Sequence, residues 1–522
     1  MNGMKRREFL ALTPAAGLGA APALPRIGLV TSGHARLARP SSPEDPLDYQ
    51  RVRDMVWKAI EYAGARAGSL EAKIRPGSWV VIKPNIVSIR PSSAYRLGDI
   101  TDPRVTRAVV EYVARRARAA RITIAEGGSY RRLSDTTKDH AAFQNGQRVD
   151  LTNFDWGTED FPGFGGSFGR MIAEFGKEFP GVRFDYIDLS YDAYRDASGK
   201  LRRIQVPRAP NGVGAFGARP DYYIARTIRE CDFLIDVPVI KVHLQCGLTA
   251  CLKNYVGTAV REAYQSPGLF NNTLLHREHS LDNRIDHFIA DLASFHPPDY
   301  CVMDGIRGLQ YQEHNNDRAD QMVRSNLVLA GEDPVALDAM AANLIGFRPW
   351  DIEYLHLAAS RGMGTLDLDR ADLAGDDPER LRRRWEKPRR WYGRCNREWL
   401  LTRSPDADLA AWTPHTSRFD TLDLSGWSAA AVRVRAEGHR KAVLWVGAQG
   451  RLGATLNGET LMREEARTSY RVGQFQKPVE LRPGENLLVF RLEALSESAR
   501  LSVLLTGPRN DGDTVEGIRW SA

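Results

Sequence analysis

The feature that most constrains this chain is a regular alternation of short apolar runs with segments of helical periodicity, between about residues 50 and 346. The runs SWVVIK, RITIAE, DFLIDVPVI, DYCVMD and SNLVLAG predict buried strands, and the segments between them place apolar residues at helical spacing. Asp333-Pro334 predicts the start of the last helix and Gly346 its end. The alternation predicts an α/β domain with a mainly parallel sheet and helices on both faces, which we place at residues 45–372.

A second domain is expected because 522 residues exceed the roughly 250 to 300 that one hydrophobic core serves. After about residue 415 the apolar residues alternate with period two, and Asn457-Gly458 between two such runs predicts a hairpin turn. Residues 415–522 are therefore predicted to form an antiparallel, jelly-roll-like β-sandwich. Residues 373–414 form a predicted linker rich in Arg and Trp, which could bind nucleic acid or acidic polysaccharide. We favour a solvated linker helix and expect no nucleic-acid partner.

The N-terminus has the pattern of an export signal. Arg6-Arg7 precede Phe9-Leu10, and a weakly apolar stretch ends in APA at residues 21–23. This resembles a twin-arginine signal over residues 1–25 and implies the twin-arginine translocation machinery as a partner and a periplasmic or secreted protein. The alternative is a basic N-terminus on a cytosolic protein. No later run of eighteen apolar residues predicts a membrane span.

Polar residues stand where several predicted strands end. They are Lys83 and Asn85, Glu126 with Gly127 and Gly128, Lys241 and His243, and Asp304. The carboxyl ends of parallel strands meet at one edge of a sheet, so these groups are predicted to border one crevice. Two other interpretations stay open. Asp236, Asp304 and Asp338 could neutralise the lysines in a structural network, or the lysines could join Asn85 and Asn254 in an anion pocket that Gly127-Gly128 helps to shape.

Six segments, in order, resemble the family known as domain of unknown function 362: VVIKPNIV, DITDPRVTRAVVEYV, FLIDVPVIKVH, LTACLKNYVG, VMDGIRG and LAGEDPVALDAMAANLIGFRPWDIEYLHLAASRGMG. The resemblance covers roughly residues 45–370. Many members of that family carry a ferredoxin-like cysteine cluster. The five cysteines of this chain contain no CxxC pair, so no iron–sulfur cluster is expected.

A more distant resemblance is to the nickel-pincer lactate racemases, at DITDPRVTRAVV, IAEGGSYRR and the pair His243 and Lys253. It implies that Lys253 tethers a cofactor and that His243 is an acid/base group. Tyr130 stands where that family has its other catalytic histidine. Asp102 stands where it has an arginine that holds the substrate carboxylate, with Arg104 only a neighbour. A neutral sugar or polyol is therefore the more attractive substrate.

The remaining candidates complete one predicted site. Lys83 joins His243, Lys253 and Tyr130 as a candidate catalytic group, and His276 or His279 is the candidate ligand of nickel or another divalent ion. Lys253, Gly127 and Gly128 are the candidates for cofactor binding. The candidates for substrate contact are Asn85, Arg104, Lys241, Asn254 and Asp304.

The sequence leaves two functions open. The first is an exported enzyme that uses a metal or tethered cofactor on a carbohydrate-like or hydroxylated substrate, with racemase, epimerase or redox chemistry at carbon. The alternative is a non-catalytic periplasmic protein that binds an anionic or glycan ligand. The C-terminal segment resembles galactose-binding-like jelly rolls of carbohydrate-active enzymes, which implies a glycan ligand, although a structural cap fits as well.

Overall fold

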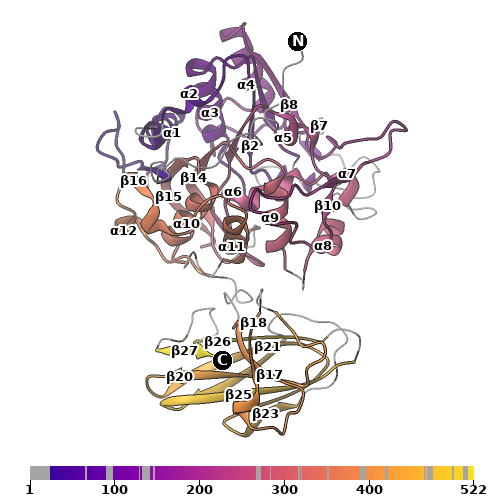
Figure 1. The fold of residues 1–522 in the computed structure, drawn as a ribbon. Coiled ribbons are helices and arrows are strands. Elements are labelled where there is room, and N and C mark those ends of the chain that lie inside the picture. Colours follow the sequence, from indigo (N-terminus) through magenta and orange to yellow (C-terminus); the bar gives the residue numbers. More distant parts are fainter. Residues whose placement is uncertain are drawn as a thin grey trace, which may run out of the picture.

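The computed structural model describes most of the chain from residue 24 onward. The described residues are 24–64, 68–89, 98–127, 130–131, 142–144, 147–265, 272–281, 284–314, 318, 320–347, 349, 352–387, 396–417, 421–463, 466, 474–495, 499–508, 515 and 517–522. The predicted signal peptide lies almost entirely outside these residues. Figure 1 shows an α/β body and, beyond the Arg/Trp-rich segment, a separate all-β body.

An eight-stranded sheet forms the centre of the α/β body. In spatial order its strands are β16 (Asp372–Gly375), β1 (Arg26–Thr31), β15 (Met322–Gly331), β14 (Tyr300–Leu309), β11 (Phe233–Val237), β2 (Trp79–Pro84), β4 (Arg121–Ala125) and β8 (Arg183–Ile187). Only β15 runs antiparallel to its neighbours, β1 and β14, and the other adjacent pairs are parallel. The predicted mainly parallel sheet is confirmed.

Three strands of this sheet were not predicted. β1 precedes the predicted start of the domain at residue 45, and β16 ends at residue 375, past its predicted end. β8 lies at the sheet edge, and none of its side chains is fully buried, so it lacks the apolar run that marks a central strand. It follows α4 (Phe168–Glu178), in a stretch for which no strand was predicted.

Helices cover both faces of the sheet, and strand residues alternate between two hydrophobic cores. In β2, Val80 and Ile82 pack in one core and Val81 in the other, because successive strand side chains point to opposite faces. The first core contains α1 (Tyr49–Gly64), α3 (Pro103–Arg116) and α4. The second contains α5 (Arg226–Glu230), α6 (Cys251–Asn254), α9 (Asp286–Ser294), α10 (Pro334–Leu344) and α11 (Glu353–Ser360). In Figure 1, α9, α10 and α11 lie on the side of the body that faces the sandwich.

The predicted start of α10 is observed. The side chain of Asp333 accepts a hydrogen bond from the Ala336 amide at 2.8 Å, and Pro334 occupies the first turn. Gly346 adopts a φ of +85°, which favours glycine. Directly after α6 the chain forms the 3₁₀ helix η3 (Tyr255–Thr258).

Short elements complete the α/β body. They are α2 (Leu70–Lys73), α7 (Arg261–Tyr264), α8 (Thr273–His279), α12 (Pro378–Leu381), η5 (Leu368–Arg370) and the paired strands β3 (Ser88–Ile89) with β5 (Tyr130–Arg131), β6 (Ala142–Gln144) with β7 (Gln147–Val149), β9 (Ile204–Gln205) with β10 (Asp221–Tyr222), and β12 (Lys241–His243) with β13 (Gly247–Thr249).

The C-terminal body is the predicted antiparallel sandwich. One sheet contains β18 (Thr413–Thr416), β17 (Glu398–Thr402), β20 (Ala429–Ala436), β25 (Gly484–Glu493), β22 (Arg451–Leu456), β23 (Glu459–Arg463) and β27 (Ile518–Ser521). The other contains β19 (Leu422–Asp423), β26 (Arg500–Thr506), β21 (Arg440–Gln449) and β24 (Phe475–Leu481). Asn457 and Gly458 join β22 to β23 with φ values of +53° and +86°, the backbone of the predicted hairpin turn.

The segment predicted as a solvated linker helix contains other structure. Among its described residues, Pro378–Leu381 is the only α-helix, and Trp385, 4% exposed, packs in the second core of the α/β body. At its other end β17 and β18, with the short helix η6 (Leu409–Ala411) between them, belong to the sandwich. Arg397, just before β17, forms an ion pair with Glu353 of α11, so a charged contact joins the two bodies.

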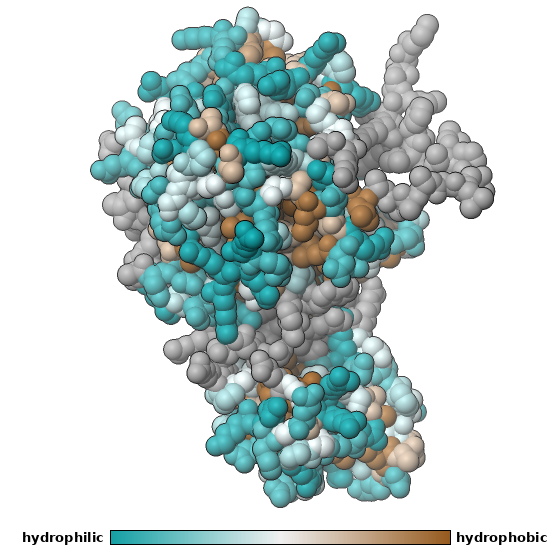
Figure 2. Space-filling model, turned by 90° about the vertical axis from the view of Figure 1, so that its left-hand side faces the viewer, coloured by the Kyte–Doolittle hydropathy of each residue, from teal (hydrophilic) through white to brown (hydrophobic). Residues whose placement is uncertain are grey.

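No helix within the described residues is long and apolar enough to cross a membrane. On the face shown in Figure 2, hydrophilic residues predominate on both bodies, and a hydrophobic patch lies on the larger one.

Candidate functional site

One cavity of about 140 Å³ gathers half of the residues predicted for the site. It lies at the carboxyl ends of β2 and β4, where a mainly parallel sheet places ligands. The predicted residues that line it are Asn85, Lys241, His243, Lys253, Asn254 and His276. These come from chain segments nearly 200 residues apart, and the sheet brings them together.

A short hairpin and a helix present the central groups. β12 and β13 pair Lys241 with Thr249 and His243 with Gly247, whose φ of +82° allows the turn. The chain then enters α6, where the buried carboxylate of Asp338 accepts hydrogen bonds from the first two helical amides at 2.7 and 3.1 Å. Lys253 and Asn254 therefore sit on a helix whose start is held from the core.

Two of the three lysines are neutralised by acids other than those predicted. Lys83 donates to Glu126 at 2.6 Å and to Asn254 at 3.0 Å, and Lys241 donates to the Asp99 carboxylate at 3.2 Å. Lys83 does not line the cavity, and it lies beside Gly257, where an added Cβ would approach its Nζ to 3.0 Å. The structural-network interpretation therefore describes Lys83 and Lys241.

Lys253 differs from the other two lysines because its amine has no hydrogen bond or ion pair to any described residue. It is partly exposed, and it lines the cavity. Burial lowers the pKa of Lys253 below its usual value, against the opposing effects of Cys246 and Glu313. Among the described lysines of the site, it is the one available to a ligand.

His243 is held in one orientation. Its Nδ1 accepts a hydrogen bond from the Gln245 amide at 3.1 Å, and its Nε2 lies 3.5 Å from Glu313 Oε1. Burial lowers the pKa of His243 well below its usual value and exceeds the opposing effect of Glu313. The neutral ring consequently carries its proton on Nε2.

Glu313 and His276 complete the charged part of the cavity. Burial opposes ionisation of Glu313, but His243, His314 and the Leu244 amide outweigh it and lower the pKa to about 2. Burial, aided by Lys253, lowers the pKa of His276 to about 4. Its imidazole packs edge-on against Phe288, and its ring nitrogens have no hydrogen-bond partner among the described residues. At neutral pH Glu313 is therefore ionised, and the imidazoles of His243 and His276 are uncharged.

Below the cavity, Asn254 connects several predicted residues. Its Nδ2 donates to Asp236 at 2.6 Å, and its Oδ1 accepts from Asn85 Nδ2 at 2.9 Å. Asn85 Oδ1 and Thr249 Oγ1 are buried without a hydrogen-bond partner among the described residues. Both residues line the cavity, so it offers unused polar atoms next to Lys253.

Several predicted residues lie elsewhere. Arg104 binds Asp102 at 2.9 and 2.7 Å in a buried cluster, and Asp304 accepts the Asp102 and Ile306 amides at 2.7 and 2.8 Å, so neither lines the cavity. Burial, with the adjacent Asp102, raises the pKa of Asp304 to about 7. These residues fix the entry to α3 and do not form a substrate site.

The predicted histidine pair is also separated. His276 faces the cavity, whereas His279 stacks on Tyr222 at 3.9 Å and bonds the Tyr264 hydroxyl at 3.0 Å. The two side chains point in different directions from a single helical turn. Of the two alternative candidate ligands, His276 is the one that lines the cavity.

The predicted glycine pair does not present free amides for an anion where it is described. The Gly127 amide donates to Glu126 at 2.9 Å, and an added Cβ would lie 2.3 Å from Ser190 Oγ, so this glycine serves close packing. Gly128 and the side chain of Tyr130 lie outside the described residues.

Sequence reasoning missed Glu313, His314 and Arg261, which line the cavity. Glu313 and His314 follow β14 in an irregular segment with no periodic pattern, and Arg261 opens the four-residue helix α7. The signal that could have revealed the first two was their place a few residues after a predicted strand. Arg261 offered no such signal.

Comparisons with known proteins agree with the resemblances given above. The family model described as domain of unknown function (DUF362) matches residues 203–343. No curated protein matches. Residues 203–343 include every ionisable residue that lines the cavity except Glu126.

Several solved structures match parts of the chain. The lactate racemase apoprotein from Thermoanaerobacterium thermosaccharolyticum is 14% identical over 55% of this chain and 53% of its own, with a TM-score of 0.26. A family 35 carbohydrate binding module from an environmental isolate is 14% identical over 24% of this chain and 90% of its own, with a TM-score of 0.16. The β-glucosidase from Kluyveromyces marxianus is 9% identical over 21% of this chain and 16% of its own, with a TM-score of 0.17.

The chain thus spans about half the length of the racemase it resembles and under a fifth of the β-glucosidase. At such TM-scores these similarities carry no argument about fold or chemistry. Residues 203–343 are therefore similar to the domain of unknown function DUF362.

Proposed function

We propose that the cavity is the active site of an enzyme that moves a proton or hydride at a carbon atom of a small hydroxylated substrate. The observation that supports it is the set of unused polar atoms on one wall: Lys253 Nζ, Asn85 Oδ1 and Thr249 Oγ1. Buried polar atoms without a partner are rare in folded proteins because each costs free energy. A polar ligand would satisfy them.

The two imidazoles suit different parts of such a reaction. The ring nitrogens of His276 have no hydrogen-bond partner among the described residues, so this imidazole can accept a proton from the substrate. His243, with Nδ1 occupied by the Gln245 amide, presents Nε2–H as a hydrogen-bond donor. Glu313 then stabilises positive charge that develops on either ring. This assigns the proton acceptor to His276, where the sequence had suggested His243.

Lys253 is the residue that would hold a tethered cofactor. Its primary amine is unpaired and opens into the cavity, which is what a covalent link to a carbonyl or carboxyl carbon needs, so the residues present fit such a group. When bound, a cofactor of this kind supplies the hydride acceptor. Nickel or another divalent ion could join it, with His276 as the available imidazole ligand.

Substrate contacts follow from the same wall. Asn85 Oδ1 can accept a hydrogen bond from a substrate hydroxyl, and Thr249 Oγ1 can donate to one. Arg104 is not available to hold a carboxylate, but Arg261 lines the cavity and brings a guanidinium that the sequence did not predict. Both polyols and hydroxy acids therefore belong among the substrates to be tested.

The sandwich offers a second surface, for which we propose glycan binding. A cavity of about 450 Å³ lies on its seven-stranded sheet, lined by Trp412, Thr455, Arg463 and Arg491 among others. Two arginines beside an apolar sheet face suit a sugar that carries a carboxylate, because a guanidinium group can form two parallel hydrogen bonds to a carboxylate. Isothermal titration of the full chain with uronic-acid oligosaccharides tests it. Unchanged binding after Arg463→Ala/Arg491→Ala would contradict it.

Intact-mass analysis tests the role of Lys253. Protein purified from its native host is expected to carry extra covalent mass that peptide mapping places on Lys253, and Lys253→Arg is expected to carry none. Lys73, a partly exposed lysine paired with Glu332 at 2.8 Å, provides the control, since Lys73→Arg should retain the adduct. An unmodified Lys253 in the native protein would exclude a tethered cofactor.

Isotope exchange separates enzyme from binding protein. Native protein incubated with hydroxy acids and polyols in deuterated water is expected to incorporate deuterium at carbon or to invert a stereocentre. His276→Ala should lower the rate by about 10²-fold or more, the usual contribution of a general base. Tight binding of a substrate with no exchange, inversion or oxidation would favour the non-catalytic alternative.

A further inference from the structure

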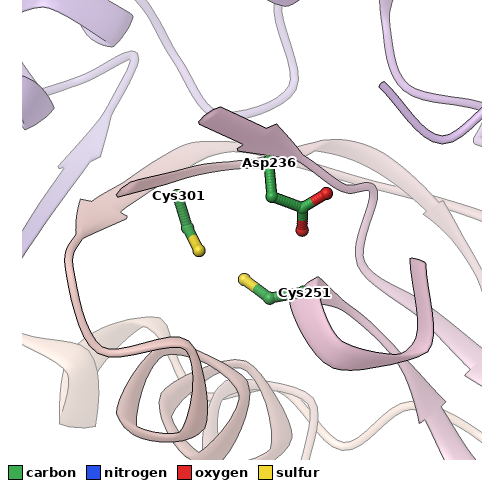
Figure 3. Close-up of side chains that lie close together, drawn as sticks. All are labelled: Asp236, Cys251 and Cys301. Atoms are coloured by element: carbon green, nitrogen blue, oxygen red, sulfur yellow. The ribbon is translucent and has the colours of Figure 1, made fainter. Parts of the chain in front are cut away.

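Three buried side chains converge directly beneath the cavity. Asp236 belongs to β11, Cys251 is the first residue of α6, and Cys301 belongs to β14. One carboxylate oxygen and the two sulfur atoms all lie within 4.8 Å of one another, and Figure 3 shows the side chains pointing toward a common centre. All three residues are fully buried, with 0% of their surface exposed.

The carboxylate of Asp236 is only half satisfied. Its Oδ1 accepts from Asn254 Nδ2 at 2.6 Å, whereas its Oδ2 is buried without a hydrogen-bond partner among the described residues. A carboxylate oxygen in that state costs free energy unless a cation or donor reaches it. The groups available beside it are two thiols, which are weak donors and good metal ligands.

We propose that Asp236, Cys251 and Cys301 bind a thiophilic divalent cation of the zinc type. Two thiolates and one carboxylate form a ligand set that zinc accepts and that magnesium and calcium do not favour. Tetrahedral ligands at about 2.0 to 2.3 Å from one ion lie roughly 3.3 to 3.8 Å apart, which is within the 4.8 Å that bounds the three ligand atoms here.

This site is separate from the cavity, because none of the three residues lines it. Its position gives it a structural consequence. The ion would join β11, β14 and the first residue of α6, and α6 carries Lys253 and Asn254 two and three residues later. The bound ion therefore fixes the helix that presents Lys253, and the proposal stands whether or not the cavity is catalytic.

Zinc titration of the full-length protein tests the proposal. After removal of metal under reducing conditions, the protein is titrated with Zn²⁺ against a chromogenic chelator, and bound metal is counted by elemental analysis. One zinc per chain is expected. Cys251→Ser and Cys301→Ser should each weaken zinc binding by at least about a hundredfold. Loss of a residue that only hydrogen-bonds a metal ligand already weakens binding by up to about a hundredfold, and these two residues are proposed to bind the metal directly.

Two variants serve as controls. Cys246→Ser changes a buried cysteine outside the cluster, whose thiol donates to the Leu248 carbonyl at 3.5 Å, a bond that a hydroxyl can replace. It should retain the zinc affinity. His276→Ala should retain it too, and loss of zinc in this variant alone would place the ion in the cavity and overturn the proposal.

A spectroscopic measurement on the wild-type protein tests the proposal even if some variants fold poorly. Co²⁺ in the wild-type site is expected to show thiolate-to-cobalt charge-transfer absorption, which Asp236→Asn should shift and Cys301→Ser should reduce. Circular dichroism checks that each variant is folded. Absence of these bands in folded wild-type protein, or a native mass lower by two hydrogens that maps to a Cys251–Cys301 disulfide, would overturn the proposal.

Discussion

At the scale of single residues, the site is a set of buried polar groups with unequal partners. Lys83 and Lys241 have acids within hydrogen-bond distance, whereas Lys253 has none among the described residues. A buried charge is tolerated when it is paired, so the pairs hold the structure and the unpaired amine is left for a ligand. Replacing a paired lysine should therefore destabilise the protein, whereas replacing Lys253 leaves no described acid without its partner.

Replacing Lys83 should destabilise the protein strongly. Lys83→Met leaves Glu126 buried without its partner, which costs about 3–5 kcal/mol in the free energy of unfolding measured by urea titration. The double variant Lys83→Met/Glu126→Gln should be less destabilised than Lys83→Met alone. The exposed pair Lys58 and Glu61, 2.7 Å apart, is the control, and Lys58→Met should cost under about 1 kcal/mol. If the destabilisation of the double variant equals the sum of those of Lys83→Met and Glu126→Gln, the two side chains are not coupled and the prediction is wrong.

His279 should make stability depend on pH. Burial lowers its pKa in the folded protein from 6.5 to about 4, so between these values the unfolded chain binds more protons. Stability is therefore full above pH 6.5 and is lost as pH falls toward 4, by roughly 3 kcal/mol. His279→Gln should flatten this slope in urea titrations across that range, and replacing the exposed His415 should not. An unchanged slope in His279→Gln would show that other groups cause it.

At the scale of secondary-structure elements, α6 is the least self-sufficient helix of the site. It has four residues and no side-chain cap of its own. Its first two amides, of Cys251 and Leu252, donate hydrogen bonds to the carboxylate of Asp338 in α10. Short helices are stabilised by tertiary contacts more than by propensity. The position of Lys253 is therefore set by a residue that lies more than eighty positions later in the chain.

Removing the Asp338 carboxylate should loosen α6. Asp338→Ala leaves two buried amides without acceptors and should lower the free energy of unfolding by about 2 to 4 kcal/mol. Hydrogen exchange should speed up at the Cys251 and Leu252 amides specifically. The control is Asp408→Ala, which removes an exposed cap from the Ala410 amide and should cost about 1 kcal/mol or less. Unchanged protection at Cys251 would mean that Asp338 does not hold the helix.

At the scale of the whole molecule, the chain joins an α/β body to a sandwich and begins with a basic segment that we propose to be an export signal. β1 starts at Arg26 and pairs with both β15 and β16, so cleavage near Ala23 would leave the sheet complete. Twin-arginine export carries folded proteins, which suits a site whose groups come from distant segments. The proposal places the mature protein in the periplasm or outside the cell.

Conservative changes at Arg6 and Arg7 test the export signal. Arg6→Lys/Arg7→Lys keeps the charge of the segment but removes the twin arginine, so the precursor should accumulate in the cytoplasm of its native host. Cell fractionation and immunoblotting measure the distribution. Arg36→Lys/Arg39→Lys, beyond the predicted signal, should be exported normally. Equal export of both variants would indicate another route or another function for the segment.

Sequence and tertiary structure contributed differently. Local patterns determined the parallel sheet, the start of α10 at Asp333 and the Asn457-Gly458 hairpin, because periodicity, capping and turn chemistry act between neighbouring residues. They missed β8, which has no apolar run at the sheet edge, and Arg261, which no local pattern marks.

Which lysine would remain unpaired was not a local property. Lys83, Lys241 and Lys253 look alike in the sequence, and their partners Glu126 and Asp99 are 43 and 142 positions away. His276 and His279 share one helical turn, yet only one faces the cavity. The sequence by itself determined the mainly parallel sheet and the antiparallel sandwich, because these follow from local periodicity. Only the tertiary structure decided which groups neutralise one another and which are left for a ligand, because pairing depends on distances between segments that the chain brings together only when it folds.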